Sequence, residues 1–252
     1  LFTPATYPSW YARNQSETES LKIMAERNPQ TFRSAAQAAS PVRTSGIEVN
    51  RVLRNTYMLL GMTLAWSAAV AGGAMALNLP HPGFILMLVG FFGLLFAVHK
   101  TANSAWGLFW VFAFTGFLGY TLGPILNVYL QLQNGGMLVT SALATTAVAF
   151  VGLSAYALIT RKDFSFLSGF LVVGFFVLMG AVLLAWLFDL SGFHTAISAG
   201  FVLFASAAIL WQTSAIIHGG ENNYVLATVL LYTQIYNLFI SLLQIFGALG
   251  ED

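Results

Sequence analysis

Amide and hydroxyl side chains share one face of the last apolar segment of this 252-residue chain. The residues are Asn223, Gln234, Asn237, Ser241 and Gln244. On a helix they fall within about 80° of one another, because each residue advances by about 100°. Hydrocarbon offers no hydrogen-bond partner, so such a face must contact protein or water. The amides therefore either hold helices together or serve a permeation path or a switch.

A small and polar face also occurs in the preceding apolar segment. Ser198, Ala205 and Gln212 recur every seven residues, which places them on one side of a helix. We predict that Gln212 and Gln234 approach each other in the core of a helical bundle. A hydrogen bond between such amides contributes on the order of 0.6 kcal/mol in a membrane.

The sequence contains part of a protease motif, which we do not expect to support catalysis. Gly152-Leu-Ser-Ala155, with His194 or His218, has a faint likeness to an intramembrane serine protease. Ala155 replaces the second glycine of Gly-x-Ser-Gly, and Ser154 and His194 are expected at opposite membrane faces. The four histidines form no metal-binding pattern, and no phosphate-binding loop precedes a lysine. We expect no enzyme activity, no catalytic residue, no metal and no cofactor.

His218 and Glu221 flank two glycines between the last two apolar segments. Two interpretations stay open for this loop. The residues form a pH-sensitive pair on the cytosolic side, or they cap the helices that meet there.

Seven apolar segments must position these side chains. Hydrophobic residues make up 58% of the chain and charged residues 8%, whereas a soluble domain has about 25% charged residues. Each segment is close to the roughly 20 residues that a membrane-spanning helix needs. We therefore predict an all-α integral membrane protein. The predicted spans are residues 55–77, 84–98, 105–129, 137–159, 166–187, 196–217 and 223–249.

The positive charges predict the orientation. All ten Lys and Arg precede the first segment or lie in alternate loops. They are Arg13, Lys22, Arg27, Arg33, Arg43, Arg51, Arg54, Lys100, Arg161 and Lys162. Positive residues are retained in the cytoplasm, so we expect a cytoplasmic N-terminus and a periplasmic C-terminus. The net charge of +1 indicates no acidic partner, and no nucleic-acid partner is expected.

The composition divides the chain into two parts. Residues 1–50 are polar and lack an apolar period, which predicts a flexible cytoplasmic tail. Residues 51–252 form the seven-helix transmembrane domain. The tail is either a handle for a partner or a protease, or a passive leader that sets orientation.

Small residues predict where helices approach closely. The first segment has Ala65, Ala69 and Gly73 at spacing four, and the third has Gly116, Gly119 and Gly123. Helices in lipid pack closely through such residues.

Several runs resemble a known family. Arg51-Val-Leu-Arg-Asn-Thr-Tyr57, Ile216-Ile-His-Gly-Gly-Glu-Asn-Asn-Tyr224 and Leu231-Tyr-Thr-Gln-Ile-Tyr-Asn-Leu-Phe239 are similar to the YccA branch of the Bax-inhibitor family. Residues 113–127 and 160–169 are similar too. The resemblance covers residues 50–250 in order.

The resemblance implies six helices around a central seventh. It also implies a bacterial inner-membrane protein that associates with the FtsH protease and its membrane-associated regulators and modulates the protease. The protein itself would be a substrate engaged through the tail. Other branches imply a pH-gated calcium leak, switched by an acidic pair where Gln212 and Gln234 stand here. An amide does not titrate near neutral pH, which weighs against that alternative.

Overall fold

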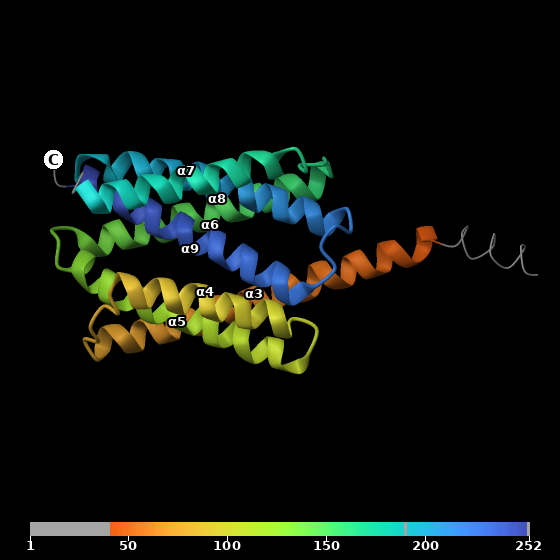
Figure 1. Cartoon of the computed structure of the whole chain (residues 1–252), viewed down its shortest axis with the longest axis horizontal. Helices are drawn as coiled ribbons and strands as arrows, with labels where there is room; N and C mark the ends of the chain where they lie inside the picture. The colour runs from red at the N-terminus through yellow and green to blue at the C-terminus, as the bar shows by residue number, and fades with distance from the viewer. Residues whose placement is uncertain (1–40, 189–190, 251–252) are drawn as a thin grey trace, which may run out of the picture. The chain divides into compact units, whose positions relative to one another are not determined.

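The structure is a computed structural model, which describes residues 41–188 and 191–250. These residues form helices and turns without a strand (Figure 1). Seven of the helices are long and apolar enough to cross a membrane. In chain order the helical elements are α3 (Pro41–Ala76), α4 (Phe84–Thr101), α5 (Ala105–Leu130), α6 (Gly135–Thr160), α7 (Leu167–Phe188), η1 (Ser191–Phe193), α8 (His194–Ile217) and α9 (Tyr224–Leu249).

The predicted spans match these helices within a few residues, except at the start of α3. That helix begins at Pro41, and its apolar part is Glu48–Ala76. Proline is favoured in the first helical turn, because the missing N–H needs no partner there. The predicted flexible tail falls mainly on residues 1–40, which lie outside the described residues.

Residues in the left-handed backbone conformation lie at the ends of several helices, where the sequence has helix-breaking residues. Asn78 (φ 48°) follows α3, Asn134 (φ 62°) precedes α6 and Gly219 (φ 74°) follows α8. Asparagine and glycine tolerate this conformation better than other residues. These short turns keep consecutive helices antiparallel and close together.

Glycines of α5 form its close contact with α3. A Cβ added at Gly119 would lie 2.4 Å from the Ser67 carbonyl oxygen, and one at Gly123 would lie 2.6 Å from the Ala74 Cβ. A Cβ at Gly116 would meet Trp66. The predicted role of the third segment's glycines is therefore confirmed.

The predicted contact face of the first segment is wrong. Ala65, Ala69 and Gly73 are exposed. Ser67, Ala71 and Ala74 are buried and face the glycines of α5 instead. Both sets have small residues at helical spacing, so spacing alone did not distinguish the two faces.

Burial is distributed unequally among the helices. In the most apolar stretch of each helix, 67% of residues are buried in α9, whereas none is buried in α7. The α9 helix contacts α4, α5, α6 and α8. The α4 and α7 helices expose large side chains such as Ile85, Phe96, Phe170 and Phe176. Such apolar surface is typical of helices that face lipid.

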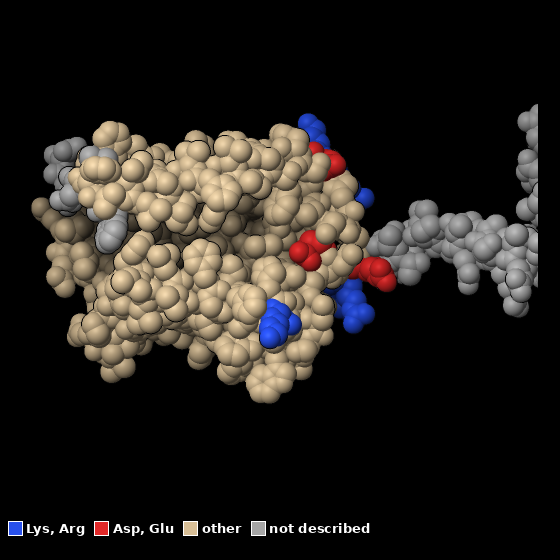
Figure 2. All heavy atoms as spheres, viewed as in Figure 1, with Lys and Arg blue, Asp and Glu red and all other residues tan. Residues whose placement is uncertain are grey.

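Charged side chains gather at one end of the bundle (Figure 2). This end is called the basic end below, and its described Lys and Arg residues are Arg51, Arg54, Lys100, Arg161 and Lys162. Lys100 lies at the C-terminal end of α4, and Arg161 and Lys162 directly follow α6.

Candidate functional site

The polar face predicted on α9 divides into three environments along the helix. Asn223 belongs to the basic end. Its side-chain oxygen accepts hydrogen bonds from the Val225 and Leu226 N–H groups, and so caps α9. Its Nδ2 donates to the Ala102 carbonyl at 3.1 Å and to Asn103 Oδ1 at 2.8 Å. Asn223 therefore joins two loops and is not part of a membrane-embedded site.

Gln212 and Gln234 occupy the second environment, which is packed between helices. Gln212 is 2% exposed, and its Nε2 has no hydrogen-bond partner. Gln234 Oε1 is buried and also lacks a partner, as do Ser154 Oγ and Thr213 Oγ1. The two amides do not hydrogen-bond to each other, and their approach stays a prediction. Unpartnered polar atoms destabilise a packed core and are available to water or a ligand.

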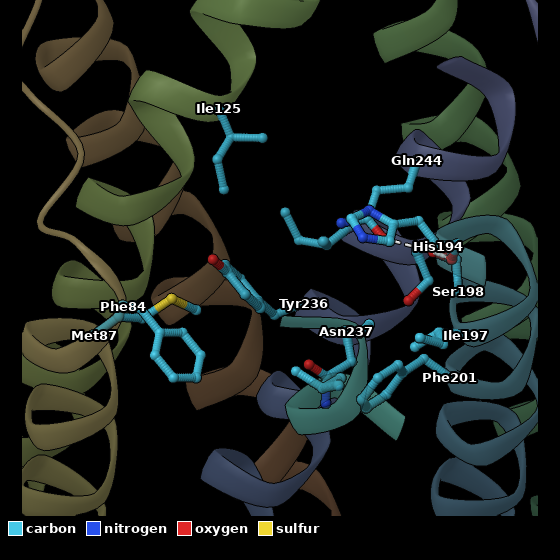
Figure 3. A pocket seen from close by; sticks show the side chains of 14 residues that line it. Phe84, Met87, Ile125, His194, Ile197, Ser198, Phe201, Tyr236, Asn237 and Gln244 are labelled. Atoms are coloured by element: carbon cyan, nitrogen blue, oxygen red, sulfur yellow. Dashed lines mark hydrogen bonds between the residues drawn. The ribbon is translucent and has the colours of Figure 1, made fainter. Parts of the chain in front are cut away.

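The remaining three residues line a cavity toward the opposite end of the bundle. Asn237, Ser241 and Gln244 of α9 line it together with His194 and Ser198 of α8. Gln244, His194 and Ser198 lie near one another on one side of the cavity, and Ile125, Phe84 and Met87 lie on the other side (Figure 3). The cavity volume is about 430 Å³. The Ser198 hydroxyl lies 2.6 Å from Gln244 Oε1 and 2.8 Å from the His194 carbonyl oxygen. A cavity of this size with few polar groups is typical of a small-ligand site.

The predicted face of α8 is buried as a unit. Ser198, Ala205 and Gln212 are 1%, 0% and 2% exposed, respectively. Their seven-residue spacing therefore did identify the side of α8 that packs in the protein. This side connects the cavity at Ser198 to the packed amides at Gln212.

Two tyrosines of α9 form contacts that sequence analysis missed. The Tyr232 hydroxyl hydrogen-bonds with Ser67 Oγ of α3 and donates to the Thr115 carbonyl of α5. The Tyr236 hydroxyl and Thr121 Oγ1 of α5 are 2.8 Å apart. A buried tyrosine hydroxyl needs a partner, so two tyrosines four residues apart were a usable signal. They link α9 to the paired helices α3 and α5.

Ser214 fastens the loop after α6 to the end of α8. Its hydroxyl accepts a hydrogen bond from the Phe164 N–H at 3.0 Å and donates to the Lys162 carbonyl at 3.2 Å. His218 Nδ1 is 2.9 Å from the Ser214 carbonyl oxygen. Near this loop, the Ser165 N–H and hydroxyl lower the pKa of Asp163, and the charge of His218 lowers it further.

His218 and Glu221 bind to backbone rather than to each other. Glu221 Oε1 accepts a hydrogen bond from the Asn223 N–H at 2.8 Å, and His218 lies against the end of α8. These contacts fit the capping interpretation of the loop.

In the described part of the chain, Ser154 of the partial protease motif does not pair with a histidine. Ser154 Oγ is buried without a hydrogen-bond partner, and His218 contacts Ser214. Within residues 41–188 and 191–250, three or more metal-ligating side chains do not cluster. Among these residues, the polar side chains of the cavity and the packed amides can form hydrogen bonds.

The fold defines a multi-pass helical membrane protein. The chain belongs to the family described as "Inhibitor of apoptosis-promoting Bax1", whose profile matches residues 49–251. It is 51% identical to the Escherichia coli K12 protein named "Modulator of FtsH protease YccA", over 85% of this chain and 98% of that protein. A protein of unassigned function from Pseudomonas aeruginosa is 64% identical, over 81% of this chain and 92% of its own length.

Further relatives agree on location. A protein from Escherichia coli O6:H1, also 51% identical over 85% of this chain and 98% of its own length, is named "Inner membrane protein YccA". A Vibrio cholerae relative, 42% identical over 82% of this chain and 93% of its own length, is named a membrane protein. With its seven apolar helices, the chain is a multi-pass protein of the bacterial inner membrane.

Proposed function

We propose that this protein associates with the FtsH protease in the inner membrane and modulates its turnover of membrane proteins. The observation that carries the proposal is the 51% identity to the Escherichia coli protein named as a modulator of FtsH. The likeness covers 98% of that relative, and the family profile matches residues 49–251, where the seven apolar helices lie almost entirely.

The proposal includes an orientation in the membrane and an arrangement of the helices. Residues 1–50 lie in the cytoplasm and the C-terminus in the periplasm, since the basic end then faces the cytoplasm. In the proposed arrangement six helices surround α9; the support is that the most apolar stretch of α9 is 67% buried, the largest share among the seven helices. The tail gives the protease a polar segment to engage, and the protein is itself a substrate.

Lipid-facing helices offer surface to a membrane partner. The α7 helix contacts α8, and its outer face exposes Phe170, Val173 and Phe176. Transmembrane helices of FtsH or its regulators can pack on such a face, because packing drives association in lipid.

The test measures degradation in native membranes. The full chain is compared with a variant lacking residues 1–50 and with a variant in which the same residues are reordered. We expect FtsH to degrade the full chain and to spare the shortened variant. We also expect overproduction of the shortened variant to slow turnover of another FtsH substrate. Equal half-lives with and without active FtsH, together with unchanged turnover of the second substrate, would contradict the proposal.

A cation leak is the second candidate function. Its support is the polar cavity together with the unpartnered amides of Gln212 and Gln234. The family's acidic pair is replaced by these amides, so we expect any leak to be small and insensitive to pH.

A further inference from the structure

The polar cavity is open toward the side of the bundle. The α4 helix packs against α5, whereas α7 packs against α8, and extensive contact between α4 and α7 or α8 is missing from the described chain. Phe84 and Met87 of α4 form one wall, and Val182 of α7 belongs to the other. Figure 2 shows a hollow between the two halves of the bundle. A molecule in the bilayer therefore has direct access to α9.

Three side chains of α9 form a polar ladder inside this cavity: Asn237, Ser241 and Gln244. Ser241 is 4% exposed, and Asn237 lies one helical turn before it on the same cavity wall. Gln244 uses its Oε1 with Ser198, which leaves its Nε2 free to donate. With His194 and Ser198 of α8, the ladder therefore presents donors and acceptors in a space whose other lining is mainly apolar.

The ladder extends from the membrane boundary toward its middle. At 1.5 Å per residue, Gln244 lies about 8 Å and Asn237 about 18 Å from the end of α9 at Leu249. The helix has 26 residues and exceeds the roughly 30 Å hydrocarbon core. Gln244 thus lies near the depth of lipid esters, and Asn237 lies well inside the hydrocarbon.

Size and charge limit the occupant. One turn of a helix with its side chains fills roughly 500 Å³, so a cavity of about 430 Å³ does not hold a spanning helix. Among the described residues, the lining has no Asp, Glu, Lys or Arg. Divalent cations prefer several oxygen ligands that include carboxylates, and the described lining offers none. Part of an extended amphiphile, with the remainder in the bilayer, fits both limits.

We propose that the cavity binds one phospholipid from the leaflet opposite the basic end. The glycerol diester region of the lipid lies against the ladder, and one acyl chain follows apolar residues such as Phe84, Ile197 and Phe201. An acyl chain alone would leave the buried polar groups of Asn237 and Ser241 without hydrogen-bond partners, which is costly. We therefore place the polar glycerol diester region deeper in the membrane than its usual position at the membrane–water interface. This site is independent of the proposed effect on FtsH.

The first test measures lipid retention by native mass spectrometry. The full chain is reconstituted in vesicles of phosphatidylethanolamine and phosphatidylglycerol and then extracted in mild detergent. We expect one retained lipid per chain, and about eightfold weaker retention after Asn237→Leu with Gln244→Leu. Gln234→Leu is the matched control, because it makes the same change on α9 outside the cavity, and we expect it to retain lipid like the unaltered chain.

The outcomes separate the possible occupants. Retention of both lipids supports recognition of the shared diester region. Equal retention by the unaltered chain and the double variant would overturn the proposal, as would a more than tenfold preference for one headgroup. A co-purifying polypeptide in place of lipid would also overturn it.

A second test distinguishes lipid from water without disturbing the fold. The chain has no cysteine, so Ser241→Cys introduces a unique thiol of similar size. We expect a charged maleimide to label this thiol slowly in the vesicles and at least about tenfold faster after delipidation in detergent. Equally fast labelling in both conditions would show a water-filled cavity and overturn the proposal.

Discussion

Ser198 at the start of α8 and Gln244 near the end of α9 are joined by a hydrogen bond of 2.6 Å. This bond holds two antiparallel helices together at the mouth of the polar cavity. It also orients the Gln244 amide so that its Nε2 remains available. The same helix pair carries the unpartnered amides of Gln212 and Gln234 nearer the basic end. The polar residues of α8 and α9 therefore serve two different environments.

Adding a methyl group at Gly119 should destabilise the bundle. A Cβ there would lie 2.4 Å from the Ser67 carbonyl oxygen, and backbone cannot move aside cheaply. We expect Gly119→Ala to lower the free energy of unfolding by about 1–3 kcal/mol, measured by thermal unfolding in detergent.

The matched control for that change is Gly152→Ala in α6. A Cβ at Gly152 meets no atom within 4 Å. This variant should be neutral or more stable by up to about 1 kcal/mol, because alanine favours helix over glycine. Equal destabilisation by both substitutions would contradict the close approach of α3 and α5.

Removing the Tyr232 hydroxyl should weaken the link between α9 and the α3–α5 pair. Tyr232→Phe leaves buried Ser67 Oγ without this partner. We expect a loss of about 1 kcal/mol in the free energy of unfolding, measured by chemical unfolding in detergent micelles. Tyr156→Phe removes an exposed hydroxyl from α6 and should have no measurable effect. A Tyr232→Phe variant as stable as the unaltered chain would refute this role.

Acid should weaken the loop that Ser214 fastens. The pKa of Asp163 is lowered from its usual 3.8 by the Ser165 N–H and hydroxyl and by the charge of His218. A lowered folded-state pKa stabilises the fold above the unfolded pKa, and this stability is lost as the pH falls through the folded pKa. Below about pH 4, Asp163→Asn should therefore differ less from the unaltered chain than at neutral pH. Thermal unfolding over this pH range is the measurement, and a difference that grows in acid would contradict the expected sign.

Cation flux should depend little on pH in the unaltered chain. The amides of Gln212 and Gln234 do not change charge between about pH 6 and pH 8, whereas two nearby carboxylates can share a proton. We expect low flux from proteoliposomes at both pH values and a pH-dependent flux after Gln212→Asp with Gln234→Asp. A steep pH response of the unaltered chain would show that another group acts as a switch.

Much of the fold was predictable because lipid imposes simple rules. Spans from 84 to 249 matched their helices closely, since hydrocarbon thickness sets helix length. The seven-residue spacing of Ser198, Ala205 and Gln212 identified a buried face. Gly116, Gly119 and Gly123 marked a close contact of α5, because only small residues permit such approach.

The details of the site were less predictable, since they depend on which helices become neighbours. Asn223 shares a helical face with Gln234, yet it caps α9. Periodicity placed Ala65 on a packing face, whereas Ser67 makes the contact with α5. The cavity beside Asn237 arises because α4 and α7 pack on different partners. A one-dimensional pattern contains no information about such a gap.

Co-purification from native membranes tests the central claim most directly. The full chain would carry an affinity tag at its C-terminus, and membranes would be solubilised gently with lipid present. FtsH and its membrane regulators should be recovered with the full chain in clear excess over a tagged, unrelated seven-helix protein. Recovery of FtsH at the level of that control would contradict the proposed association with the protease.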